Sequence, residues 1–209
     1  MGVYTIAKDV ENEIVVEKSR FICILKKVQS EQEAQDFVKT VKKQYWDATH
    51  NCSAYLIDDM AQHSSDDGEP SGTAGVPMLA VLRKAMVQGV VAVVTRYFGG
   101  VKLGAGGLVR AYTNSVALAL QKAGKAERVE MGHFEFFVNL NDTGKILNKL
   151  YADGKYKIKE VSYKEKARIL FTMRRDECEE AEKYLTELLQ SQVELCYTGG
   201  EIVEVAVVI

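Results

Sequence analysis

The chain has 209 residues, enough for one large or two smaller domains, and its 47% hydrophobic content is sufficient for a packed core. A formal net charge of −2 argues against a protein wholly devoted to nucleic acid, which usually carries a basic excess, but it allows a local basic face. The apolar run 89–94 is too short to span a membrane, and no apolar stretch follows a basic leader at the start, so we expect a cytoplasmic protein without a membrane partner.

The four cysteines lie far apart in the sequence, at Cys23, Cys52, Cys178 and Cys196. They form neither a CxxC pair nor the Cys/His spacing of a metal site. We therefore expect reduced thiols, no metal and no cofactor.

The first 131 residues show a succession of strand and helix patterns. Ser30 followed by Glu33 is a capping box, which marks the start of an amphipathic helix. The predicted elements are strands over 3–7 and 12–28, a helix over 30–45, a strand over 49–58, a polar segment without period over 58–75, a helix over 76–86, an apolar strand over 89–98 and a helix over 108–124.

We place a domain boundary near Met131–Gly132, which gives domains of 1–131 and 132–209. The second domain shows strand patterns over 133–140, 156–163, 167–174, 193–199 and 202–208, and helix patterns over 142–153 and 176–190. The last two strand patterns follow a βαββα series, and this order predicts a ferredoxin-like βαββαβ domain. The fold class predicted for the whole chain is α+β.

Residues 68–107 hold nine of the sixteen glycines and both prolines, a concentration typical of binding loops on a rigid scaffold. Within them, a glycine loop connects a strand to a helix, which is the geometry that directs backbone amides at an anion. The loop is neither a Walker A motif nor a dinucleotide fingerprint, because Ala105–Gly106 and Val109 replace the residues that these require.

We therefore predict an anion-binding site for a phosphate-containing ligand. Its residues are Thr73, Arg96, Gly99, Gly100, Lys102, Gly104, Gly106, Gly107 and Arg110. The alternative is that the glycines only allow close packing of the helix on the sheet, while the cations are solvated.

A second polar group consists of Asp66, Asp67 and Glu69, which follow the strand that carries His50. Carboxylates near a histidine can act as acid–base groups or bind a divalent ion. Because loops at one end of a sheet converge, we predict that His50, Asp67, Glu69 and Arg96 share one cleft as the candidate catalytic residues. A solvated acidic loop and a hydrogen-bonded strand histidine are the alternative.

Basic residues alternate along the two hairpin strands of the second domain, and period two would put each set on one side of its strand. This pattern predicts an RNA-binding face made of Lys155, Lys157, Lys164, Lys166 and Arg168, with Lys159 in the same alternation. The alternative is a solvated edge, because residues 133–209 hold eleven basic against fourteen acidic side chains and show no interleaved pair of stacking aromatics.

Four segments resemble the YigZ/IMPACT family in sequence and in order. They are SRF (19–21), ATHNCSAY (48–55), DDGEPSGTAGVPML (66–79) and RYFGGVKLGAGGLVRAY (96–112). With its predicted ferredoxin-like tail the chain looks like a bacterial two-domain member, although Thr113 stands where glycine is expected in many relatives.

The resemblance implies an N-terminal domain similar to the second domain of a small-subunit ribosomal protein, to domain IV of elongation factor G and to certain small-molecule kinases. It implies a C-terminal domain similar to a ferredoxin-like domain of the same elongation factor. The serine pair of those kinases is absent, since Ala105, Gly106 and Gly107 follow the first glycines.

Eukaryotic relatives bind a large ribosome-associated activator and thereby restrain a kinase, a pathway that bacteria lack. The resemblance therefore implies a translation-linked regulatory protein that binds a ribosome-associated protein or RNA. The alternative is an enzyme or ligand-binding protein that acts on a phosphorylated or anionic small molecule at a cleft between loops 66–75 and 99–107. No catalytic residues are established for the family, so His50, Asp67, Glu69 and Arg96 remain candidates.

Overall fold

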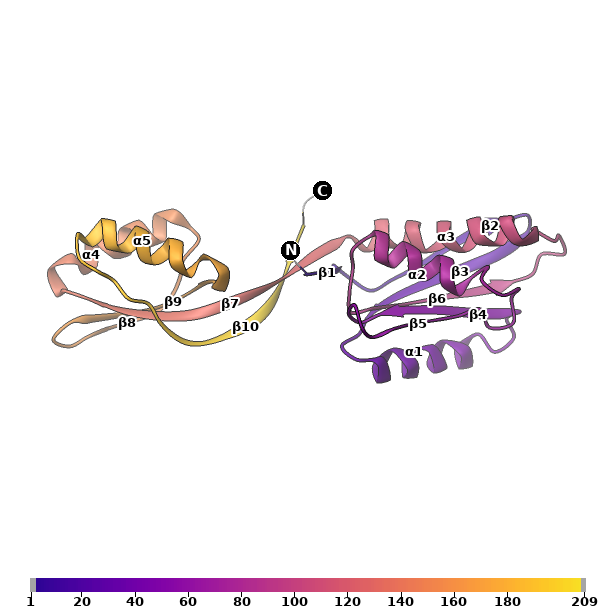
Figure 1. The fold of residues 1–209 in the computed structure, drawn as a ribbon, viewed down its shortest axis with the longest axis horizontal. Coiled ribbons are helices and arrows are strands. Elements are labelled where there is room, and N and C mark those ends of the chain that lie inside the picture. The colour runs from indigo at the N-terminus through magenta and orange to yellow at the C-terminus, as the bar shows by residue number, and fades with distance from the viewer. Residues whose placement is uncertain (1–2, 208–209) are drawn as a thin grey trace. The chain divides into compact units, whose positions relative to one another are not determined.

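The structure is a computed structural model, and it describes residues 3–207. The chain divides into two compact units: unit 1 takes the chain up to Arg128 and its last residues from Glu204, and unit 2 is Val129–Val203. The division falls inside one long strand, β7 (Lys125–Val138), which also contains the boundary expected near Met131–Gly132 (Figure 1). The strand predicted over 202–208 ends at Ala206, and Val208 lies outside the described residues.

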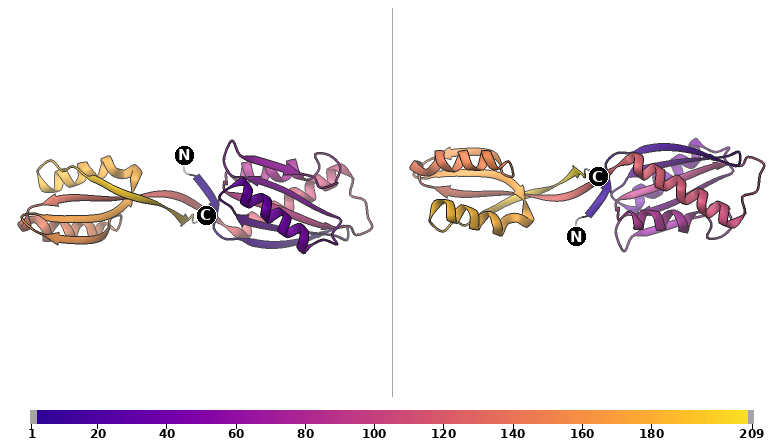
Figure 2. Two further views of the ribbon diagram at one scale, coloured as in Figure 1. Left: turned by 90° about the horizontal axis from the view of Figure 1, so that it is seen from below. Right: turned by 90° about the horizontal axis from the view of Figure 1, so that it is seen from above.

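Unit 1 contains an antiparallel five-stranded sheet in the order β2-β3-β6-β4-β5. Its strands are β2 (Val10–Val16), β3 (Ser19–Lys27), β6 (Val90–Tyr97), β4 (His50–Leu56) and β5 (Gln62–Ser65). A short strand, β1 (Val3–Ile6), pairs with the start of β7. All residues of β6 but the last are buried, because helices cover both faces of the sheet, and this explains the apolar run over 90–94 in that strand (Figures 1 and 2).

One face is covered by α1 (Glu31–Gln44), and the other by α2 (Gly75–Lys84) and α3 (Gly104–Ala123). Ser30 caps α1 as predicted, since its hydroxyl accepts from the Glu33 amide at 3.2 Å, but the Glu33 carboxylate accepts from the Gln29 amide instead of closing the box on Ser30. The α2 and α3 face holds the larger core, and its largest buried side chains include Phe21, Met78, Leu82 and Tyr112.

Two local features of unit 1 differ from the sequence prediction. The polar segment 58–75 contains β5, an edge strand whose Gln-His-Ser-Ser sequence lacks apolar alternation because no face of it is fully buried. In addition, α3 begins at Gly104 and not at 108, so three glycines lie within its first turn.

Unit 2 has the predicted βαββαβ order. The elements after β7 are α4 (Thr143–Asp153), β8 (Lys157–Tyr163), β9 (Ala167–Arg174), α5 (Cys178–Leu189) and β10 (Cys196–Ala206). Strands β7, β9 and β8 are neighbours in that order, and β10 pairs with the free side of β7. Both helices lie on one face of this sheet, over a core that includes Phe136, Ile146, Leu150 and Phe171 (Figure 1).

The two closing strands predicted over 193–199 and 202–208 are one strand, β10. Gly199 and Gly200 resemble a turn in the sequence. In the structure a Cβ at Gly200 would lie 2.7 Å from the Met131 carbonyl oxygen, so the glycine permits close pairing with β7 and does not end the strand.

Candidate functional site

The loop after β5 is organised by the Asp66 carboxylate, which binds the start of α2. It accepts hydrogen bonds from the amides of Gly72 (2.8 Å), Ala74 (3.0 Å) and Gly75 (2.8 Å). Burial tends to raise the pKa of Asp66, but these three amide bonds outweigh it and hold the pKa below its usual value. The Asp66 carboxylate therefore already occupies the position at the start of α2 where an external anion could bind.

Asp67 is fixed in the same loop by two short contacts. Its carboxylate accepts from the Asn51 amide and from the Lys42 ammonium, both at 2.6 Å. Burial tends to raise the pKa of Asp67, and the Lys42 and Asn51 contacts reverse that effect and lower it. Asp67 therefore remains an ion-paired carboxylate and is poorly suited to exchange protons near neutral pH.

Glu69 and Arg96 form a buried ion pair at the end of the sheet. Glu69 Oε1 is 2.6 Å from Arg96 Nη1 and accepts from the Tyr112 hydroxyl at 2.8 Å. The side chains of Glu69 and Arg96 are only 3% and 6% exposed, and the guanidinium lies between the rings of Phe21 (5.4 Å) and Phe98 (5.6 Å). The pair is thus a desolvated salt bridge whose partners depend on each other for charge compensation.

His50 completes the group from the strand beside Arg96. The two residues are directly opposite in the β4–β6 register, so their side chains lie on the same face of the sheet. His50 Nδ1 donates to the Asp67 carbonyl oxygen at 2.8 Å, and Nε2 is 3.8 Å from Glu69 Oε2. The structure therefore brings His50, Asp67, Glu69 and Arg96 together. The His50 side chain is 20% exposed, whereas those of Glu69 and Arg96 are almost fully buried.

Three polar residues that were not among the predicted site residues, Ser19, Cys52 and Tyr112, also contact this cluster. Ser19 Oγ accepts from the Gly99 amide at 3.1 Å, and the Cys52 thiol is 3.0 Å from the Asp66 carbonyl oxygen and 3.3 Å from the Tyr112 hydroxyl. Burial raises the pKa of Cys52 to about 12, so the thiol stays protonated and unreactive. The alternation along β4, which puts Cys52 on the same face as His50, is the signal that could have identified it.

The residues predicted to bind an anion differ in whether they already have a partner within the chain. Thr73 is buried and donates to the Pro70 carbonyl oxygen at 2.6 Å, and Arg96 is paired with Glu69. Both are therefore occupied within the chain, whereas Lys102 and Arg110 are exposed and make no ion pair among residues 3–207.

The glycines of the loop serve different purposes. A Cβ at Gly99 would lie 2.0 Å from the Lys18 carbonyl carbon, so this residue packs directly on the β2–β3 turn. Gly100 and Gly104 adopt φ values of +88° and +68°, which side chains rarely tolerate. Gly106 has a Cβ position that meets nothing within 4 Å, so neither packing nor backbone conformation requires glycine there.

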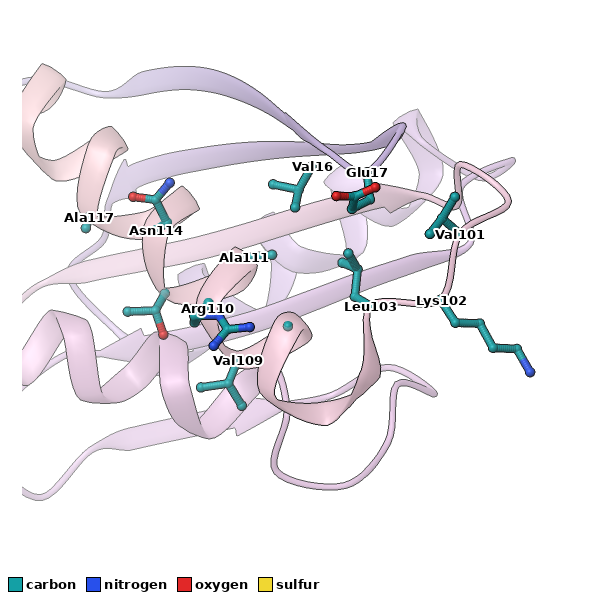
Figure 3. A pocket seen from close by; sticks show the side chains of 12 residues that line it. Val16, Glu17, Val101, Lys102, Leu103, Val109, Arg110, Ala111, Asn114 and Ala117 are labelled. Carbon is teal, nitrogen blue, oxygen red and sulfur yellow. The ribbon is translucent and has the colours of Figure 1, made fainter.

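The exposed cations contribute to a pocket of about 940 Å³ between α3 and the turn that follows β2, which we term the α3 groove (Figure 3). It is lined by Val16, Glu17, Val101, Lys102, Leu103, Gly107, Val109, Arg110, Ala111, Thr113, Asn114 and Ala117. No side chain caps α3 at its start, so the first amides of the helix have no side-chain partner.

The basic residues of unit 2 do not form two alternating rows. Lys155 precedes β8, and its ammonium is 3.8 Å from Glu180, while Lys159 lies at an irregularity where the β8–β9 register shifts between Ile158 and Glu160. This irregularity breaks the period that the sequence prediction assumed. The remaining residues are Lys157 at the start of β8, Lys164 and Lys166 in the β8–β9 turn, and Arg168 on β9.

Among residues 3–207 no group of three or more His, Cys, Asp or Glu side chains is arranged to hold a metal ion. None of the helices in this same range is long and apolar enough to cross a membrane.

Comparison with known proteins identifies the class of domain: residues 17–120 match the Impact N-terminal domain. This range contains the His50–Arg96 cluster and nearly all of the α3 groove. The IMPACT family member YvyE of Bacillus subtilis (strain 168) is 47% identical over 194 residues, which is 92% of this chain and 89% of that protein. The family member YigZ of Escherichia coli (strain K12) is 47% identical over 111 residues, 51% of this chain and 54% of that protein. This chain belongs to the IMPACT family.

A solved crystal structure described only as that of a hypothetical protein is 30% identical. It matches with a TM-score of 0.60 and covers 95% of this chain and 98% of its own. The two-unit architecture is therefore shared with a protein whose description assigns no activity.

Proposed function

We propose that this protein is a cytoplasmic, translation-linked regulator that binds a ribosome-associated protein, and that the α3 groove is the surface it uses. Membership of the IMPACT family supports the link to translation. The proposal includes kinship of unit 1 with the second domain of a small-subunit ribosomal protein and with domain IV of elongation factor G. It also includes kinship of unit 2 with a ferredoxin-like domain of that factor, and the α+β architecture of both units agrees with this.

The observation that carries the proposal is the composition of the groove. Val101 is 40% exposed, and it lies with Leu103 and Val109 around a hollow that also presents Lys102 and Arg110. Figure 3 shows Leu103, Val109 and Arg110 near the start of α3, Glu17 as the acidic residue of the lining, and the Lys102 side chain extending outward from the loop. Leu103 and Val109 are half-buried, and apolar side chains that gather in a hollow with access to solvent are typical of a protein contact.

The electrostatics of the groove favour a partner of one kind of charge. Two unpaired cations and the uncapped helix start outweigh the single carboxylate of Glu17, and a helix N-terminus carries about half a positive charge. A partner segment that combines apolar and acidic side chains would complement this surface. The groove is therefore suited to an acidic, amphipathic segment of a protein.

The alternative, an enzyme for a phosphorylated small molecule at the cleft between loops 66–75 and 99–107, has weaker support. Asp66 and Asp67 are bound by amides and a lysine, and Glu69 is bound by Arg96 and Tyr112. A catalytic role needs a group that is free to exchange protons or to contact a substrate. The side chains of Asp67 and His50 retain access to solvent, at 28% and 20% exposed. Because Asp67 is ion-paired with Lys42, one partly exposed histidine remains, which is a limited basis for catalysis.

Sedimentation of cell lysate through a sucrose gradient tests the proposal. At low salt we expect the full chain to migrate with ribosomal fractions. At high salt we expect it to return to the top of the gradient, because contacts between exposed charges are screened. Absence from every ribosomal fraction at low salt would overturn the proposal and favour the small-molecule alternative.

A further inference from the structure

The β-sheet of unit 2 has one face without helices, and that face carries an exposed aromatic side chain. Both α4 and α5 lie on the opposite face (Figure 1). Along β7, Phe136 and Val138 point into the core, so the alternation of the strand puts Phe137 on the open face, where it is 54% exposed. Phe136, its neighbour in sequence, is 1% exposed, which shows that the outward position of Phe137 is a consequence of register.

Phe137 belongs to a row of side chains that crosses three strands. It pairs directly with Arg168 on β9, and Arg168 pairs with Ser162 on β8. The Arg168 guanidinium is held by Glu135 at 2.5 Å and lies 3.8 Å from Glu160, so its position is restrained and its charge is largely compensated. The row thus offers an exposed aromatic ring on β7, with a guanidinium and a hydroxyl at the paired positions of β9 and β8.

This row forms part of a pocket of about 1070 Å³, lined by Phe137, Asn139, Glu160, Ser162, Lys164, Glu165, Lys166 and Arg168. Lys164 and Lys166 are exposed in the hairpin turn, and neither makes an ion pair within residues 3–207. Asn139 and Ser162 carry both donors and acceptors of hydrogen bonds. An aromatic face, hydrogen-bonding side chains and unpaired cations are the three groups that a single nucleotide needs.

We propose that this pocket binds one nucleotide of a single-stranded nucleic acid, with the base stacked on Phe137 and its phosphate near Lys164 and Lys166. Recognition of splayed bases on an exposed aromatic of an open sheet face is a common mode of RNA binding. The two carboxylates in the lining, Glu160 and Glu165, oppose a continuous phosphate backbone. They limit the site to one or two phosphates and exclude a duplex.

The inference goes beyond the proposed function, since it concerns unit 2 and does not depend on what binds the α3 groove. It also replaces the RNA-binding face predicted from the sequence. Lys164, Lys166 and Arg168 remain in it, Lys155 and Lys157 drop out, and Phe137 enters as the central residue.

The test is fluorescence anisotropy of the purified full chain with a labelled single-stranded RNA octamer, the DNA of the same sequence and a duplex RNA. Phe137→Ala should weaken binding of the single strand by about 5- to 150-fold, the range measured for loss of one stacked base, and Phe137→Trp should retain it. Tyr163→Ala is the matched control, because Tyr163 is a 63% exposed aromatic at the same hairpin that does not line the pocket. It should bind as the unchanged protein does.

The phosphate contacts are tested by salt dependence. Lys164→Gln with Lys166→Gln should reduce the slope of log affinity against log salt by roughly 1.4, which is about 0.7 for each lost contact to a single strand. Lys149→Gln with Lys183→Gln, at exposed positions on α4 and α5, is the control with the same change in net charge. Comparison of RNA with DNA then shows which single strand the site prefers.

Three results would overturn the inference. They are no binding of either single strand, equal binding of the duplex, or equal affinity of Phe137→Ala and Tyr163→Ala. A loss seen only with the lysine variants counts against it too, because it would indicate nonspecific attraction of charge. The lysate sedimentation described above is independent of these outcomes, so the two proposals can fail separately.

Discussion

Replacing Arg96 with methionine should destabilise unit 1 by about 3–5 kcal/mol, the usual consequence of leaving one partner of a buried ion pair uncompensated. The Glu69 side chain is only 3% exposed. Without Arg96, its carboxylate keeps the Tyr112 hydroxyl at 2.8 Å and the His50 ring at 3.8 Å. Methionine retains apolar bulk between the aromatic rings of Phe21 and Phe98, so the destabilisation reports lost charge compensation more than lost volume.

The matching change in the partner should be milder. Glu69→Gln keeps an oxygen that accepts hydrogen bonds from Tyr112 and Arg96. The variant therefore loses only the negative charge that strengthens the 2.6 Å bond to Arg96, and the expected destabilisation is about 1.5–3 kcal/mol. In the double variant neither charge is buried. We therefore expect the double variant to be more stable than Arg96→Met alone, which is the sign that identifies a coupled pair.

Pulsed thiol labelling along a urea titration measures the stability of unit 1 by itself. Cys23 and Cys52 are fully buried in that unit, whereas Cys178 and Cys196 belong to unit 2, so mass spectrometry separates the two signals. At a urea slope of about 2 kcal/mol/M, the Arg96→Met change should lower the midpoint by roughly 2 M. A double variant no more stable than Arg96→Met would refute the argument that the two charges compensate each other.

Two further predictions use the same labelling assay. Gly99→Ala should destabilise unit 1 by about 1–3 kcal/mol or more, because its Cβ would lie 2.0 Å from the Lys18 backbone. Gly106→Ala should stabilise unit 1 by up to about 1 kcal/mol, since its Cβ meets nothing within 4 Å and alanine favours the helix. A destabilising Gly106→Ala would contradict the finding that glycine is not required there. Asp66 and Asp67 have folded-state pKa values below that of an unfolded aspartate, about 3.9, so their stabilisation is present above that pH and is lost as the pH falls through the folded values. Asp66→Asn should therefore flatten the acid limb of a stability profile from pH 7 to pH 3, and an unchanged limb would contradict the role of its three amide contacts.

Elements with a strong hydrophobic period could be predicted from the sequence. The apolar run of β6 and the amphipathic α1 follow directly from burial on two faces and on one, and the βαββαβ order of unit 2 follows in the same way. Prediction from the sequence failed for β5 and β10. β5 is held by pairing with β4 and not by apolar burial, and the glycines of β10 permit close approach to β7.

The candidate site shows a similar division. The convergence of His50, Glu69 and Arg96 could be predicted, because strand ends at one edge of a sheet meet there. The hydrogen-bond partners that occupy the carboxylates could not be predicted, since the positions of Tyr112 and of the α2 amides depend on tertiary packing. For the same reason the sequence could not reveal Phe137, whose exposure depends on which face of β7 the helices cover.

The measurement that tests the central claim most directly is gradient sedimentation of a groove variant beside a charge-matched control. Lys102→Glu with Arg110→Glu reverses the two unpaired cations of the α3 groove, and Lys43→Glu with Lys84→Glu makes the same change in charge at exposed positions on α1 and at the end of α2. If the groove binds a ribosome-associated partner, the first variant should lose about tenfold or more of the material in ribosomal fractions at low salt, while the control should sediment as the unchanged protein does. Equal sedimentation of the two variants would contradict the assignment of the α3 groove.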